Sequence, residues 1–199
     1  MRPAMVKISI DADLYLKNIE LRESEDILLL VDANRPYLRE WLPWLDLTRN
    51  IDEMLAFVES AIRQQTSALG FQAGIWHSDR LAGVIGYHHL EWANRSTCIG
   101  YWLAEDEQRK GIMTKSCRAL VDYAFDDLRL NRVEIRCATE NTKSRAIPER
   151  LGFKPEGTLR EAEWLYDHFV DHVVYGMLAR DWQALRSNQK AAKNSTYTT

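Results

Sequence analysis

The segment EDEQRKGIMTKS, residues 105–116, carries residue types that suit the binding of an anion. It follows CIGYWLA, which predicts a strand, and precedes CRALVDYAFDDL, which predicts a helix. The first N–H groups of a helix have no partner within the helix, and the helix dipole adds positive charge there. Arg109 and Lys110 add two cations, and Gly111 allows close approach to the backbone. The segment therefore predicts a phosphate site, although an ordinary basic turn before a helix fits the same residues.

Two other phosphate-binding motifs do not occur in this sequence. A P-loop requires GxxxxGK[ST], and a dinucleotide fingerprint requires GxGxxG within a βαβ unit. The strands expected before Gly111 form an antiparallel meander instead, because short polar turns separate FQAGIWH, LAGVIGYHHLEW and CIGYWLA. A bound phosphate would therefore belong to a different kind of site.

The elements that position this segment follow from hydrophobic periodicity. Helices are expected from Ser24, from Asn50 to about Leu69, over Gly111–Leu130 and over Lys143–Leu151, with short or broken helices around Pro36 and Pro43. Besides the meander, strands are expected at Val6–Ile10, Leu14–Ile19, Arg132–Ala138, Gly152–Leu159 and Trp164–Leu178. We expect one α+β domain over residues 1–184, followed by a polar tail, residues 185–199, that frays.

Composition excludes several classes of protein. The chain has 199 residues, of which 46% are hydrophobic, which suits one domain with a substantial core. A net charge of −3 argues against bulk binding of nucleic acid. The three cysteines form no CxxC pair, so we expect reduced thiols and no metal site. Without a signal peptide or a membrane-spanning run, the expected location is cytoplasmic.

Several segments, in the right order, resemble the GNAT superfamily of acyl-CoA-dependent N-acetyltransferases. QRKGIM, from Gln108, is similar to its first signature, and NTKSRAIPERLGF, from Asn141, is similar to its second. IGYWL, EGTLREA and REWLPWLD resemble the branch that acetylates the N-termini of ribosomal proteins. The resemblance implies the GNAT fold, a twisted, mixed, mostly antiparallel sheet of about seven strands flanked by helices.

The same resemblance implies that acetyl-CoA binds between two strands that splay apart. Backbone groups of Trp102, Leu103 and Ala104 would contact the pantetheine. Main-chain N–H groups would hold the pyrophosphate, from residues Arg109, Lys110, Gly111, Ile112, Met113 and Thr114. Asn141 would bind the pantetheine arm, and it also suits the N-cap of the following helix.

Many members of the superfamily use a tyrosine as the general acid, but Pro148 stands at that position here. The ribosomal-protein branch uses a serine instead, which corresponds to Ser144 and would donate a hydrogen bond to the leaving thiolate. The proposed base of that branch corresponds to Glu163, acting directly or through water. Ser144 also fits an ordinary helix start, and Glu163 an ordinary solvated acid.

His88, His89 and Glu91 are the other candidates for the base. Adjacent residues of a strand point to opposite faces of the sheet, so at most one of the two histidines faces the cleft. A free α-amine, with a pKa near 8, needs only a modest base. No cysteine falls within the signatures, so direct attack by the amine in a ternary complex is expected.

The segment REWLPWLD is expected to shape the acceptor site. Trp41 and Trp44 would wall a groove or pack in the core, and Arg35 or Arg39 would attract acidic residues of a peptide. The expected acceptor is a ribosomal protein's N-terminal α-amine. The alternatives are a small amine, such as a polyamine, an aminoglycoside or an amino-acid derivative, or a coenzyme-A-binding module without turnover. The relatives also suggest a homodimer.

Overall fold

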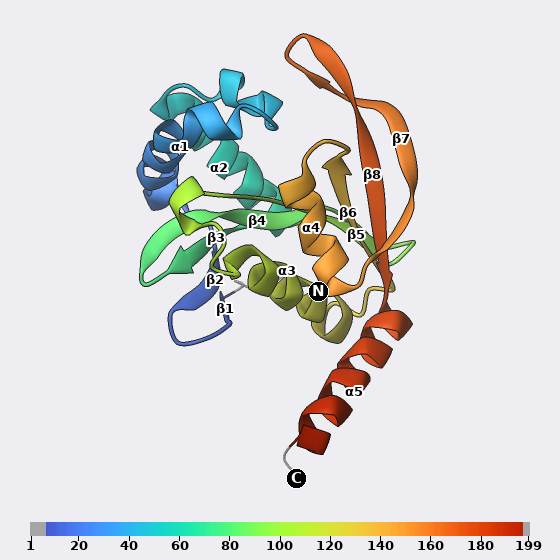
Figure 1. Ribbon diagram of the computed structural model, residues 1–199. Helices are drawn as coiled ribbons and strands as arrows, with labels where there is room; N and C mark the ends of the chain where they lie inside the picture. Colours follow the sequence, from blue (N-terminus) through green and yellow to red (C-terminus); the bar gives the residue numbers. More distant parts are fainter. Residues whose placement is uncertain (1–6, 197–199) are drawn as a thin grey trace.

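The computed structural model describes residues 7–196, with side chains as far as residue 189. This part of the chain forms a mixed sheet flanked by helices (Figure 1). The strands are β1 (Lys7–Ser9), β2 (Leu14–Asn18), β3 (Phe71–His77), β4 (Arg80–Glu91), β5 (Ser96–Leu103), β6 (Arg132–Ala138), β7 (Lys154–Leu165) and β8 (His168–Leu178). The helices are α1 (Ser24–Leu38), α2 (Ile51–Thr66), α3 (Ile112–Asp122), α4 (Thr142–Leu151) and α5 (Ala179–Thr196). Residues 1–6 and 197–199 of the expected domain and tail lie outside the described residues.

The eight described strands lie in the order β1-β2-β3-β4-β5-β6-β8-β7. Only β5 and β6 are parallel among them, and their pairing ends where Ile99 lies beside Ile135. β5 continues to Leu103, so the edge that faces β6 has no strand partner over its last four residues. The expected fold is confirmed, with eight strands in place of about seven, and a gap opens between β5 and β6.

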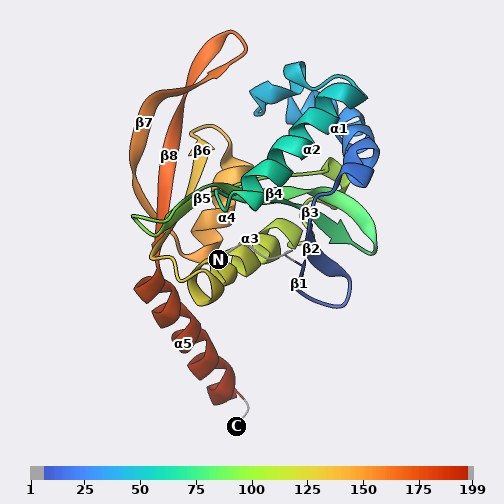
Figure 2. The same cartoon turned by 180° about the vertical axis from the view of Figure 1, so that it is seen from behind.

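Helices α1 and α2 lie on one face of the sheet, and α3 and α4 lie on the other (Figures 1 and 2). A hydrophobic core lies on each face. The predicted stripe of α3 is buried on one face, where Cys117 and Leu120 have no exposed surface and α4 packs beside them. On the other face, Val31 of α1 packs with Val58 of α2. Each amphipathic helix thus buries its apolar side against the sheet, and the gap at the end of β5 has walls from both layers.

Helix α1 passes through Pro36, where broken helices were expected. Proline lacks the N–H that would bond four residues back. The helix ends two residues later, at Leu38, so the missing bond falls in its last turn. Pro43 then begins a short 3₁₀ segment, Pro43–Leu47, as its fixed φ favours.

Of the last two strands, β7 is longer and β8 shorter than expected, so the turn between them falls further along the chain. β7 continues to Leu165, and Tyr166 and Asp167 form the turn to β8. The predicted break after Leu159 is instead an irregularity of the pairing: Leu159 lies opposite His172 and Glu163 opposite Val170. Four steps along β7 therefore match two along β8, which is a bulge.

Helix α5 covers residues 185–196, where fraying was expected. Trp182 is buried, and its indole Nε1 donates to Asp122 at 2.8 Å. Arg186, one turn on, pairs with Asp122 at 3.2 Å and with Asp126 at 2.6 Å. These contacts fix the first turns of α5 against the end of α3, and the helix then extends away from the sheet (Figure 2).

Candidate active site

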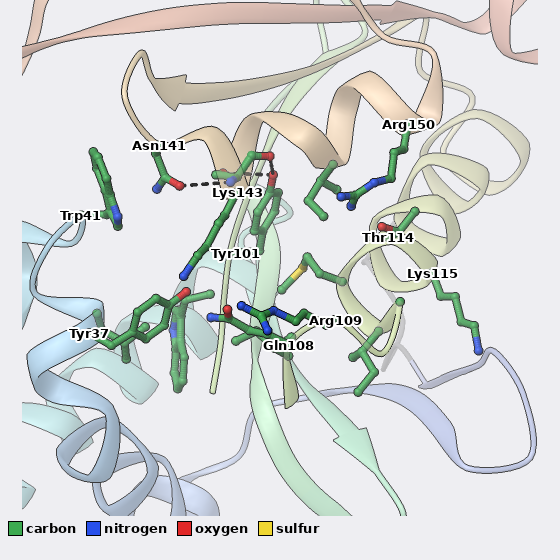
Figure 3. Close-up of a pocket in the computed structure, with 18 of the residues that line it drawn as sticks. Tyr37, Trp41, Tyr101, Gln108, Arg109, Thr114, Lys115, Asn141, Lys143 and Arg150 are labelled. Atoms are coloured by element: carbon green, nitrogen blue, oxygen red, sulfur yellow. Dashed lines mark hydrogen bonds between the residues drawn. The ribbon is translucent and has the colours of Figure 1, made fainter. Parts of the chain in front are cut away.

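A cavity of about 820 Å³ lies among α1, β5, α3 and α4 (Figure 3). Most of the residues that the sequence predicted for coenzyme binding line it: Trp102, Leu103, Arg109, Gly111, Ile112, Met113, Thr114 and Asn141. Ser144 and Trp41 line it as well. The fold thus brings both signature segments, about 30 residues apart in sequence, to one cavity.

The loop before α3 has a backbone shape suited to an anion. Arg109 has φ +62° and Gly111 has φ +77°, so the chain passes twice through the left-handed region. A side chain at position 111 would meet no atom within 4 Å, which leaves the approach to the backbone open. Successive N–H groups in such a loop, followed by a helix N-terminus, form an anion-binding concavity.

The described cavity lining is cationic. Four cations line it, Arg109, Lys115, Lys143 and Arg150, and no Asp or Glu does. Lys115 is paired with Asp11 at 2.8 Å, and the Lys143 ammonium lies 5.3 Å from the centre of the Tyr37 ring. A long ligand with several phosphates, such as coenzyme A, fits this volume, backbone and charge.

Lys110 and Ala104, which were also expected to contact the coenzyme through backbone groups, do not line this cavity. The Lys110 ammonium bonds the buried carboxylate of Glu107 at 3.1 Å, and His77 bonds the same carboxylate at 2.8 Å. Lys110 lines a separate cavity of about 240 Å³. Ala104 is buried and donates its N–H to Ala82 of β4 at 2.8 Å, away from the β6 side. Lys110 therefore anchors the loop before α3, residues 108–111, to Glu107, and its side chain does not face the main cavity. This loop is called the phosphate loop below.

Three polar side chains meet near the start of α4. The hydroxyl of Tyr101 donates to the carbonyl of Ser144 at 3.0 Å, and the Ser144 hydroxyl donates to the Tyr101 oxygen at 3.2 Å. Cys137 Sγ lies 3.2 Å from Ser144 Oγ. Burial raises the pKa of Tyr101 well above its ordinary value, so this phenol stays protonated at neutral pH.

Asn141 is the N-cap of α4, because its Oδ1 accepts from the N–H of Ser144 at 3.0 Å. The cap uses the oxygen of the side-chain amide and leaves its nitrogen as a donor. Asn141 can therefore cap the helix and contact a carbonyl in the cavity. Pro148 is buried within α4, so the usual tyrosine position holds no hydroxyl.

Glu163 does not line the cavity. It lies on β7 and pairs with His172 of β8 at 3.2 Å. His88 lies on β4 with its ring over Gly100, on the sheet face opposite the buried Tyr87. Surrounding protein atoms lower the pKa of His88, and the nearby charge of Glu163 acts in the opposite direction. Glu163 and His88 therefore lie close together, on the sheet face that carries α1 and α2.

The remaining candidate bases are exposed. His89 is 3.7 Å from Glu91, and both side chains reach solvent. This arrangement suits a surface ion pair and not a group that works within a cavity.

Arg35 has a structural position in place of the expected contact with an acceptor. Its guanidinium donates to the carbonyls of Leu45 at 2.7 Å and Thr48 at 2.8 Å, and it also bonds Asp32. Trp44 is half-buried and packs between Phe57 and Trp102, each at 6.5 Å between ring centres. Trp44 thus packs against Trp102, which agrees with the alternative that it packs in the core.

The Arg39 side chain also has partners within the protein. It bonds the carboxylate of Asp46 at 2.8 Å and 3.0 Å and lies 3.9 Å over the ring of Tyr166. The Tyr166 hydroxyl donates to the carbonyl of Leu42 at 2.6 Å. The turn of the β7–β8 hairpin is therefore joined to the segment after α1.

Several residues of the site were missed from the sequence. Tyr101 precedes Trp102 on a strand, so alternation alone would turn it toward α4. Lys143 and Arg150 are seven residues apart, two helical turns, which places both on one face of α4. Cys137 and His172 were not identified, because the turn from β6 to α4 and the pairing of β7 with β8 bring them to Ser144 and Glu163.

Among the described residues, no group of three or more His, Cys, Asp or Glu side chains could hold a metal ion. In the same part of the chain, no helix is both long and apolar enough to cross a membrane.

Comparison with known proteins agrees with this geometry. The acetyltransferase (GNAT) domain family matches residues 13–154. The Bacillus subtilis protein YdaF, provisionally named a ribosomal N-acetyltransferase, is 35% identical over 180 residues, covering 90% of this chain and 98% of YdaF. The ribosomal-protein-serine acetyltransferase of Escherichia coli is 27% identical over 171 residues, covering 86% of this chain and 96% of that protein.

Solved structures are similar as well. RimL, an α-N-protein acetyltransferase in complex with coenzyme A, has a TM-score of 0.84 and 28% identity, covering 89% of this chain and 99% of RimL. The microcin self-immunity acetyltransferase MccE, in complex with acetyl-CoA and AMP, has a TM-score of 0.82 and 28% identity, covering 85% of this chain and 94% of MccE.

The chain belongs to the GNAT acetyltransferase family. It is an acyl-CoA-dependent N-acetyltransferase whose cosubstrate is acetyl-CoA.

Proposed function

We propose that this protein transfers the acetyl group of acetyl-CoA to the N-terminal α-amine of a ribosomal protein in the cytoplasm. The observation that carries the proposal is the single cavity that joins the phosphate loop of α3 to the hydroxyls of Ser144 and Tyr101. Its other wall is the end of α1, with Tyr37 and Trp41, where an acceptor can enter. The similarity to RimL and to the ribosomal-protein-serine acetyltransferase supports this choice of acceptor.

The coenzyme would lie along the unpaired edge of β5. N–H groups from Arg109 to Thr114 hold the pyrophosphate, with Arg109 and Arg150 supplying charge. Trp102 and Leu103 offer backbone groups to the pantetheine, and Asn141 offers its side-chain nitrogen.

In the reaction, the acceptor nitrogen attacks the acetyl carbonyl and the bond from carbonyl carbon to sulfur breaks. Glu163 removes the proton of the ammonium, directly or through water. Ser144 turns its hydroxyl hydrogen from the Tyr101 oxygen to the sulfur and donates a hydrogen bond there as negative charge develops, while Tyr101 still bonds the Ser144 carbonyl.

A small amine is the second candidate acceptor. MccE, which is similar over 85% of this chain, was solved with acetyl-CoA and AMP, so this fold also serves an acetyltransferase that binds a small molecule. A homodimer, as expected from relatives, is compatible with either acceptor.

Isotopically labelled acetyl-CoA, incubated with the protein and a ribosomal-protein extract, tests the choice. Peptide mass spectrometry should find label on one or a few N-terminal α-amines. If only small amines stimulated thiol release, the acceptor would be a small-molecule amine and not the N-terminus of a protein. Label confined to lysine side chains would contradict the proposal.

A further inference from the structure

The β7–β8 hairpin brings an imidazole and a carboxylate together. His172 Nε2 lies 3.2 Å from Glu163 Oε2, and the side chains are 18% and 34% exposed. These exposed fractions are lower than those of His168 and Asp167 at the hairpin turn, which are 59% and 88%. The Glu163–His172 pair is therefore partly shielded from water, whereas the His168–Asp167 pair is an ordinary surface contact.

The bulge in β7 sets the direction of Glu163. Glu163 lies opposite Val170, and residues 170 and 172 of β8 share one face. The bulge is fixed by Asp171, whose Oδ1 accepts the N–H of Glu161 at 2.8 Å, and Glu161 has φ +50°. A bulge with a residue in the left-handed region costs free energy and re-aims a neighbouring side chain. Here it places Glu163 beside His172.

The titratable groups that face Glu163 come from two strands. His172 contacts it from β8, and His88 lies close to it from β4, with its ring over Gly100. Asp171 is engaged with the bulge. Gly100 precedes Tyr101, which lines the cavity and holds Ser144. The Glu163 carboxylate thus contacts the His172 imidazole, and the charge of Glu163 is felt at His88.

We propose that His172 is a positioning residue that fixes Glu163 for proton removal from the acceptor amine. The inference rests on the proposed function, in which Glu163 is the base. A hydrogen bond from Nε2–H to Oε2 orients the carboxylate and leaves Oε1 for the ammonium or a bridging water.

The test compares His172→Leu with His172→Gln, because the glutamine amide nitrogen can replace imidazole Nε2 as the donor. His172→Leu should lower kcat about tenfold, with no change in the KM for acetyl-CoA. His172→Gln should restore most of the rate. His168→Leu, which removes the exposed pair of the same hairpin, should leave the rate unchanged.

Equal losses of kcat in both His172 variants would overturn the proposal, because they indicate a packing role. Glu163→Gln provides a test that needs no turnover. In NMR spectra recorded at one pH, the His172 ring signals should shift between the wild type and Glu163→Gln, because the two side chains are in contact. Unchanged His172 ring signals would refute the pairing itself. Absence of thiol release with any acceptor would instead contradict the proposed function.

Discussion

At the scale of single residues, the phosphate loop depends on backbone geometry more than on side-chain charge. Lys110, one of its two adjacent cations, is held by Glu107, whereas Gly111 lines the cavity at φ +77°. A side chain at position 111 is strained by its φ and extends into open space, where the pyrophosphate would lie. Glycine is therefore required here for two separate reasons.

Gly111→Trp should weaken acetyl-CoA binding at least tenfold in isothermal calorimetry, because the indole blocks approach to the loop. Gly157→Trp is the matched control. Gly157 also has positive φ, +155°, and open space around it, but it lies on β7 and does not line the cavity. Both variants should lose about 1–3 kcal/mol of stability from strain, and only the first should lose affinity. If Gly111→Trp bound acetyl-CoA as tightly as Gly157→Trp, the loop would be excluded as the coenzyme site.

At the scale of elements, an ion-pair network joins β6 to β7 across β8, on the far side of the gap between β5 and β6. Arg132 of β6 bonds Glu134 at 2.7 Å and reaches across β8 to Glu156 of β7 at 2.9 Å. The crossing passes Gly176 of β8, where any side chain would collide with Glu156. The hydrogen bond from Arg132 lowers the pKa of Glu156. Burial alone would raise the pKa of Glu134, but its bonds from Arg132 and Arg136 outweigh burial and lower it.

A carboxyl whose pKa is lowered by folding stabilises the protein above its ordinary acid range, and this contribution is lost as pH falls through the lowered value. The free energy of unfolding of the wild type, from urea titrations, should therefore decrease from pH 7 to pH 3.5. Glu156→Gln should lose less over that interval, by up to about 1 kcal/mol, because Glu156 is 39% exposed and solvent screens it. Glu59→Gln, which removes an exposed pair in α2, should match the wild type. An identical pH dependence in Glu156→Gln would contradict a role for Glu156.

At the scale of the whole molecule, the acceptor side is bounded by parts of the chain that are distant in sequence. The β7–β8 hairpin reaches toward the α1–α2 layer (Figure 1), and Tyr166 bonds the carbonyl of Leu42 there. Arg39 stacks on the same ring. This contact joins the C-terminal hairpin to the N-terminal helices, and we expect it to hold the acceptor side in shape.

Tyr166→Phe should keep the stacking with Arg39 but remove the hydrogen bond. Hydrogen exchange should then accelerate at the hairpin turn, since the bond to Leu42 no longer restrains it. The KM for the acceptor should rise a few fold, while the affinity for acetyl-CoA stays the same. Tyr15→Phe is the control, because Tyr15 stacks on Trp76 far from the hairpin. Unchanged exchange at residues 165–168 would show that the bond does not restrain the turn.

Local pattern predicted the elements well. Hydrophobic periodicity predicted a helix over Gly111–Leu130, which contains α3, and Asn50 caps α2 through its bond to the N–H of Glu53. The predicted break after Leu159 was wrong, because the bulge in β7 depends on Asp171 of the next strand. Helix α5 was not predicted, and its start depends on the contact of Trp182 with Asp122. Neither partner can be identified from neighbouring residues.

The sequence by itself determined the family, the helix start with its glycine, and the segments that line the coenzyme cavity, because these depend on contiguous residues and their spacing. Only the tertiary structure decided which polar groups act together. It brings His77 to Glu107, 30 positions away, and engages Arg35 with the main-chain carbonyls of Leu45 and Thr48. It also brings Tyr101 to Ser144, 43 positions away. The physical reason is that a polar side chain takes its role from its partner, and the partner is supplied by the packing of distant strands and helices.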